Sequence, residues 1–190
     1  MLDFQKLKED FKTKEYKNIE IADLRAFIEG KIEQMIARNS TRADFAQKLQ
    51  EIIDRYNAGG SSTENYFDEL VKFTESLKDE EERAAREGLS EDELEIFDIL
   101  KKEKMTKDET QKVKLAAKSL LERLTRGKPK VLVQDWYKDS QTQEKVKTAV
   151  EKVLDKALPE SYDKELFQIK RDNVYDLIYG YSLRKMKWAA

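Results

Sequence analysis

The residues best suited to chemistry are the Lys and Arg side chains between residues 101 and 130. Eleven bases stand there against four acids, a net charge of +7. Phosphate groups bind clustered cations with little regard for exact sequence. On a helical projection, four of the cations fall outside the apolar arc: Lys112, Lys118, Arg123 and Arg126. This pattern predicts either a contact with a DNA backbone or a solvated helix face that pairs with the acid-rich stretch 79–95.

A second group of cations lies beside an aromatic ring at the C-terminal end: Arg184, Lys185, Lys187 and Trp188. A basic, aromatic segment of this kind can dock onto a protein partner, a membrane surface or a phosphate backbone. Chain ends are also often disordered, so a frayed terminus is the alternative. Trp136 and Tyr137 raise a similar choice between a recognition surface and anchors of the core, and aromatic burial favours the core.

Catalytic groups are scarce in this sequence. It contains no Cys and no His, which excludes thiolate nucleophiles, imidazole bases and the common zinc ligand sets. The glycine-rich patterns that hold nucleotide phosphates are absent as well. Carboxylate runs such as 80–82 are typical of a solvated face, because unpaired acids are rarely buried. We therefore expect no catalytic, metal-binding or cofactor-binding residue in this chain.

The elements that must position these side chains are helices. Charged residues make up 40% of the 190 residues, yet the net charge is only −2 and apolar residues recur at helical spacing. The sequence predicts an all-α fold, an irregular bundle of about seven or eight helices with no substantial sheet. We expect one helical domain over residues 1–190, divisible into 1–88 and 89–190. No apolar run is long enough to span a membrane, and a cytoplasmic location is the default.

Several helix boundaries follow from local sequence. Short polar residues before apolar stripes predict N-caps at Thr41, Thr63 and Ser140, and capping boxes at Ser90 with Glu93 and at Thr106 with Glu109. A last helix is expected to open near Ser161. Gly127 followed by Pro129 predicts the end of one helix, and Pro159 predicts the end of the next. The apolar run 131–133 is too short to form a sheet, so we expect a connector packed on the helices.

Three blocks of this sequence resemble those of a known family. Their order and spacing carry the resemblance, which covers nearly the whole chain from about residue 19. The blocks are 39–45 running on to 52–57, then 88–94 with 97–98, then 135–136, 141–142, 146, 158–159, 162–163 and 167. Together they resemble the C-terminal helical region of the R (restriction, motor) subunit of type I restriction–modification enzymes.

The resemblance implies a part of a larger subunit whose other domains cleave DNA and move it with ATP and Mg²⁺. It implies no catalytic residue here, because none of the nuclease or ATP-binding motifs is present. The expected role is a non-catalytic docking scaffold, with the methyltransferase and specificity subunits and the adjacent motor domains as partners. Two alternatives remain at this point: a module that binds the DNA backbone without sequence preference, and a helical adaptor unrelated to restriction.

Overall fold

The chain consists of helices and connecting loops in a computed structural model, which describes residues 3–15 and 17–188. These ranges contain eight α-helices, two short 3-10 helices and no strand. The all-α fold expected from the sequence is therefore confirmed. The helices pack into two compact units, Met1–Gly88 and Leu89–Ala190.

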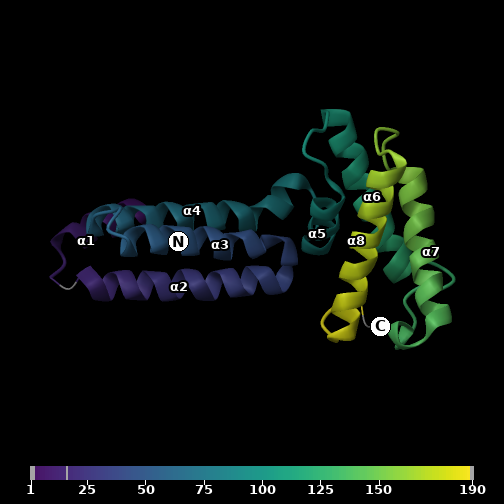
Figure 1. The fold of residues 1–190 in the computed structure, drawn as a ribbon, viewed down its shortest axis with the longest axis horizontal. Coiled ribbons are helices and arrows are strands. Elements are labelled where there is room, and N and C mark those ends of the chain that lie inside the picture. Colours follow the sequence, from purple (N-terminus) through teal and green to yellow (C-terminus); the bar gives the residue numbers. More distant parts are fainter. Residues whose placement is uncertain (1–2, 16, 189–190) are drawn as a thin grey trace. The chain divides into compact units, whose positions relative to one another are not determined.

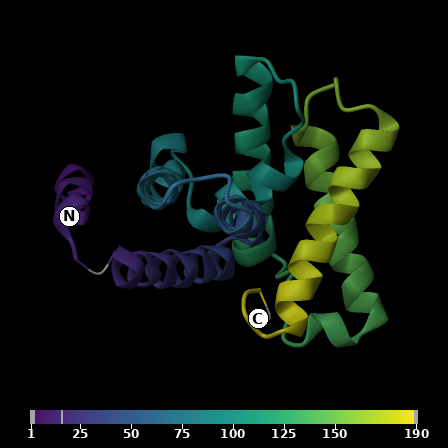
Figure 2. The ribbon, with the colours of Figure 1, turned by 60° about the vertical axis from the view of Figure 1, so that its left-hand side comes forward.

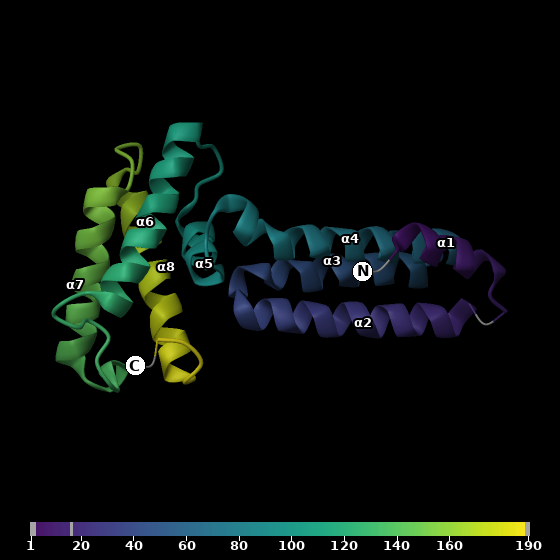
Figure 3. The ribbon, with the colours of Figure 1, turned by 180° about the vertical axis from the view of Figure 1, so that it is seen from behind.

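The first unit is built on its longest helix, α4 (Thr63–Glu87), which contacts the other three (Figure 1; Figure 3). Those three are α1 (Phe4–Thr13), α2 (Lys17–Arg38) and α3 (Asp44–Asn57). Aromatic rings meet in the core: Phe11 stacks on Phe67 with ring centroids 3.6 Å apart, and Tyr56 stacks on Tyr66 at 4.1 Å. The apolar stripes read from the sequence thus face one shared core.

A tight turn separates α2 from α3, and its residues belong to the first block of the family resemblance. The turn is a 3-10 helix, η1 (Ser40–Ala43), capped by the buried Asn39 side chain, which accepts a hydrogen bond from the Thr41 backbone N–H at 3.0 Å. The predicted N-cap at Thr41 is therefore wrong by two residues. The Arg42 guanidinium is only 2% exposed and lies 2.9 Å from a Glu80 carboxylate oxygen of α4. This block consequently fastens the turn to the core.

The second unit contains four α-helices and one 3-10 helix (Figure 2). Their bounds are α5 (Glu91–Leu100), α6 (Lys107–Arg126), η2 (Trp136–Lys138), α7 (Ser140–Ala157) and α8 (Lys164–Leu183). Helix α6 packs between α5 and α7, and α8 contacts the same two helices. Each of these helices therefore has at least two neighbours that cover its apolar stripe.

Two predicted capping boxes are confirmed. Ser90 and Glu93 exchange hydrogen bonds of 2.8 and 3.2 Å at the start of α5. Thr106 and Glu109 do the same at the start of α6, with bonds of 2.7 and 3.1 Å. Each exchange satisfies two N–H groups that the first helical turn leaves unpaired.

Two other predicted caps are displaced by one residue. The observed caps are Ser62 in place of Thr63 in α4, and Asp139 in place of Ser140 in α7. Helix α8, which was expected to open near Ser161, is capped by Asp163. In each case two adjacent or nearby residues were good acceptors, and the backbone geometry selected one of them.

Helix α6 ends at Arg126, as Gly127 and Pro129 predicted. Gly127 has φ −63° and ψ 148°, an extended conformation. A Cβ at this position would overlap the Arg123 guanidinium and the Arg123 carbonyl oxygen. Glycine is therefore required here by the close approach of the Arg123 backbone carbonyl and side chain rather than by its backbone freedom.

Candidate functional site

The four cations predicted on α6 have different surroundings. Lys112 lies 3.1 Å from Asp108, and both side chains are more than half exposed. Lys118 and Arg126 are also exposed. Arg123 instead turns back over the helix end and donates a hydrogen bond to the Pro129 carbonyl at 3.1 Å. Of the four, Arg123 is the one that lines a groove.

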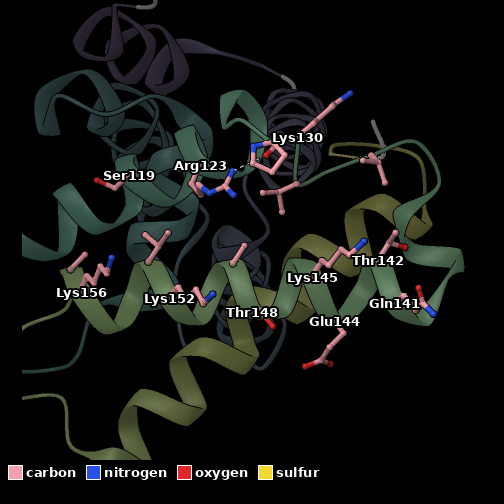
Figure 4. A pocket seen from close by; sticks show the side chains of 16 residues that line it. Ser119, Arg123, Lys130, Gln141, Thr142, Glu144, Lys145, Thr148, Lys152 and Lys156 are labelled. Carbon is pink, nitrogen blue, oxygen red and sulfur yellow. Dashed lines mark hydrogen bonds between the residues drawn. The ribbon is translucent and has the colours of Figure 1, made fainter.

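This groove, which we call the α7 groove, has a volume of about 750 Å³. It lies between α7, the C-terminal half of α6 and the connecting loop 127–135 (Figure 4). Six lining residues are apolar: Pro129, Val131, Val133, Ala149, Val153 and Ala157. Five are cationic: Arg123, Lys130, Lys145, Lys152 and Lys156. Glu144 also lines it, but Figure 4 shows its carboxylate pointing away from Arg123.

Trp136 holds the loop side of the groove in place. Its side chain is fully buried, and its indole N–H donates to Ser182 Oγ at 3.2 Å and to the Trp188 carbonyl at 3.0 Å. The Thr142 hydroxyl donates to the Trp136 carbonyl at 2.7 Å, which joins the loop to the first turn of α7. The choice left open for Trp136 and Tyr137 is thereby resolved, because both rings are buried in the core.

The predicted C-terminal contact residues divide into two groups. Arg184 and Lys185 are exposed. Lys187 folds back and places its ammonium 2.8 Å from Asp92 and 2.9 Å from Glu95, whose side chain is fully buried. Trp188 meets the Tyr181 ring edge-on, with centroids 5.4 Å apart. Lys187 and Trp188 thus have partners within the second unit, while their role toward a partner molecule stays a prediction.

Charge interactions shift several pKa values in this unit. Burial lowers the pKa of the Lys187 ammonium, but its hydrogen bonds to Asp92 and Glu95 outweigh burial, so the pKa lies above the ordinary 10.5. The Ser161 hydroxyl, the Thr106 backbone N–H and Lys102 together lower the pKa of Glu109 to about 2. Both shifts favour the charged form, as expected for groups that hold helix ends together.

Comparison with known proteins gives one family match. Residues 1–178 match the family described as type I restriction enzyme HindI endonuclease subunit-like, C-terminal. The chain belongs to this family. The expected resemblance is confirmed, and the alternative of an adaptor unrelated to restriction is excluded. No curated protein and no solved structure matches the chain.

In this type I restriction subunit domain, the family blocks build the groove as well as the core. Gln141 and Thr142 line the α7 groove. In the last block, the Tyr162 hydroxyl donates to the Leu100 carbonyl at 2.7 Å, which ties the start of α8 to the end of α5. These residues therefore help to maintain the shape of the second unit.

Sequence reasoning missed most of the cations of this restriction-subunit groove. Lys145, Lys152 and Lys156 recur at intervals of seven and four residues, which places them on one face of α7. The same face carries Ala149 and Val153. This interleaving was visible in the sequence, but the opposite wall of the groove comes from α6 and the loop 127–135, and helical spacing does not predict how that loop folds.

The described residues form neither a metal-ion cluster nor a helix suited to a bilayer. Over residues 3–15 and 17–188, no group of three or more Asp or Glu side chains is arranged to hold a metal ion. Over the same ranges, none of the helices combines the length and apolar character that crossing a bilayer would require.

Proposed function

We propose that this domain is a non-catalytic docking scaffold that holds the endonuclease subunit of a type I restriction enzyme on its methyltransferase core. The family match over residues 1–178 carries the proposal. The cores of the two units, closed by buried pairs such as Arg42 with Glu80, support it. A surface held in a fixed shape loses little entropy on binding, which suits assembly.

The proposal assigns ATP hydrolysis and DNA cleavage to other domains of the same subunit. ATP and Mg²⁺ would bind there, since the residues of this chain fit neither: the phosphate-binding glycine patterns are missing, and the described carboxylates form no metal cluster. The partners are then the methyltransferase and specificity subunits and the adjacent motor domains. The whole assembly would be located in the cytoplasm, and its substrate would be DNA.

Co-elution tests this proposal. The 190-residue chain is mixed with the assembled methyltransferase and specificity subunits of its own restriction system and passed over a sizing column. We expect one complex, and no complex with the methyltransferase core of an unrelated type I system. If the chain elutes alone at low salt, the docking role is wrong.

A second candidate function is sequence-independent binding to the DNA backbone. It is favoured by three exposed cations of α6: Lys118, Arg126 and Lys112, whose exposed ion pair with Asp108 is worth little. Binding to a duplex should weaken steeply as salt rises, because each neutralised phosphate releases counterions. Reversing these three charges should abolish binding, and an unchanged affinity would remove this function.

A further inference from the structure

We propose that the α7 groove binds an acidic amphipathic helix of the methyltransferase core. This inference rests on the proposed docking function and adds the contact surface and the chemistry of the partner. It is carried by two properties of the groove that occur together: an apolar lining and an excess of unpaired cations. Each property alone admits several occupants, whereas the combination restricts the choice.

The apolar lining calls for an apolar ligand face. Val131 and Val133 of the loop lie across from Ala149 and Val153 of α7, and three of these four side chains are only partly buried. Burying such surface is favourable by roughly 25 cal/mol per Å² of apolar area. A ligand with its own apolar side chains gains this energy. A sugar–phosphate backbone does not.

The cations give the charge of the ligand. Among residues 3–15 and 17–188, no carboxylate lies within 4.0 Å of the Lys130, Lys145, Lys152 or Lys156 ammonium. All four side chains are exposed. With Arg123, they surround the apolar lining with positive charge that the second unit leaves unneutralised. An acidic partner would supply the missing charge and be steered toward the groove.

The spacing of the lysines gives the form of the ligand. Lys145, Lys152 and Lys156 lie along one face of α7 (Figure 4), and the first and last are separated by about 16 Å at 1.5 Å per residue. A helix lying beside α7 presents side chains at the same intervals. Acidic residues separated by seven and four positions, with apolar residues between them, would therefore meet both features of the groove.

A nucleic acid fits the groove poorly. Proteins that hold single strands stack bases on aromatic rings, and no aromatic residue is among those lining the groove. A duplex would place phosphates against the lysines but leave the valines exposed to water. The exposed α6 cations Lys118 and Arg126 offer phosphates a surface without this cost.

The groove is also formed before the ligand arrives. The hydrogen bonds of Trp136 with Ser182 and Trp188 fix the base of the loop, and Arg123 fixes Pro129. Little ordering is left for the binding step, so the contact energy is retained as affinity.

Charge reversal with a matched control tests the inference. The groove variant is Lys145→Glu, Lys152→Glu, Lys156→Glu, and the control variant is Lys112→Glu, Lys118→Glu, Arg126→Glu, which changes the net charge equally. Both sets are solvent-exposed, and circular dichroism verifies that each variant folds. The binding of the 190-residue chain to the assembled methyltransferase core is measured by titration calorimetry.

We expect the groove variant to lose at least about 30-fold in affinity and the control variant to lose less than about 3-fold, because only the groove charges become paired at the interface. Val153→Asp, which alters the apolar lining with one charge, should also weaken binding. Equal losses for both triple variants, or a loss of duplex DNA binding confined to the groove variant, would overturn the inference. If the wild type and the groove variant both bind tightly, the α7 groove is not the contact surface, although the docking function stands. If the wild type does not bind, the docking function itself is refuted.

Discussion

Replacing Lys187 by Met should destabilise the second unit by about 3 kcal/mol, at the low end for breaking a buried ion pair. The Lys187 ammonium contacts Asp92 and Glu95 at 2.8 and 2.9 Å, and the Glu95 side chain has no solvent exposure. The Tyr181 hydroxyl, which donates to Glu95 at 2.7 Å, is unchanged by the substitution. A single hydrogen bond from a hydroxyl does not offset the loss of an ammonium partner for the buried Glu95 carboxylate. The variant therefore keeps most of the loss in unfolding free energy.

Urea unfolding of the wild type and the variant measures this cost directly. Lys185→Met is the matched control, because Lys185 is exposed two residues away, and its effect should stay within about 0.5 kcal/mol. Adding Glu95→Gln to Lys187→Met removes the buried charge while keeping an acceptor for Tyr181, and should recover about 2 kcal/mol. A loss below about 1 kcal/mol for Lys187→Met, or no recovery in the double variant, would refute the reasoning.

The pH dependence of the same variant checks the electrostatic cause. The pKa of Lys187 is raised in the folded chain, so its contribution is fully present below 10.5 and is lost as pH rises through the higher folded value. The difference in unfolding free energy between wild type and Lys187→Met should therefore shrink only above pH 10.5. A difference that is constant into that range would indicate packing as the cause.

Three further predictions concern single side chains of the second unit. The pKa of Glu109 is lowered from 4.5 to about 2, so its contribution to folding stability is present above pH 4.5 and is lost toward pH 2. Stability followed by circular dichroism during acid titration should therefore fall less steeply between these pH values in Glu109→Gln than in the wild type. Gly127→Ala should cost about 2 kcal/mol in thermal unfolding because its Cβ overlaps the Arg123 backbone, and a neutral result would mean that the helix end rearranges freely. Trp136→Phe should cost about 3 kcal/mol, since it leaves a cavity and removes the indole N–H that Ser182 and Trp188 accept; an unchanged urea midpoint would contradict this assignment.

Helical spacing was sufficient to predict the fold class and most helix boundaries, because it is a local property of the sequence. The caps at Ser90 and Thr106 were found for the same reason. Displaced caps such as Asp139 arose where neighbouring residues were equally suited to accept the hydrogen bond. Local patterns identify a capping region more reliably than a capping residue.

The candidate site was less accessible to sequence reasoning. Lys187 contacts Glu95, which lies 92 positions earlier in the sequence, and no local pattern predicts that pairing. The groove likewise joins α7 to a loop whose position depends on the burial of Trp136 in the core. Exposed cations such as Lys118 can be predicted from a helical projection of one helix. A groove can be predicted only when the positions of both elements that form its walls are known.

The closure of the second unit by Lys187 and Trp188 has a consequence for biosynthesis. Contacts from Trp136 and Glu95 to these residues span 52 and 92 positions. The first unit can fold as soon as its own residues have emerged from the ribosome, since domains generally fold as units from the N-terminal side. The second unit must wait until Trp188 has left the exit tunnel, and until then Glu95 and the Trp136 indole lack these partners. Chaperones would therefore meet this domain chiefly through its second unit.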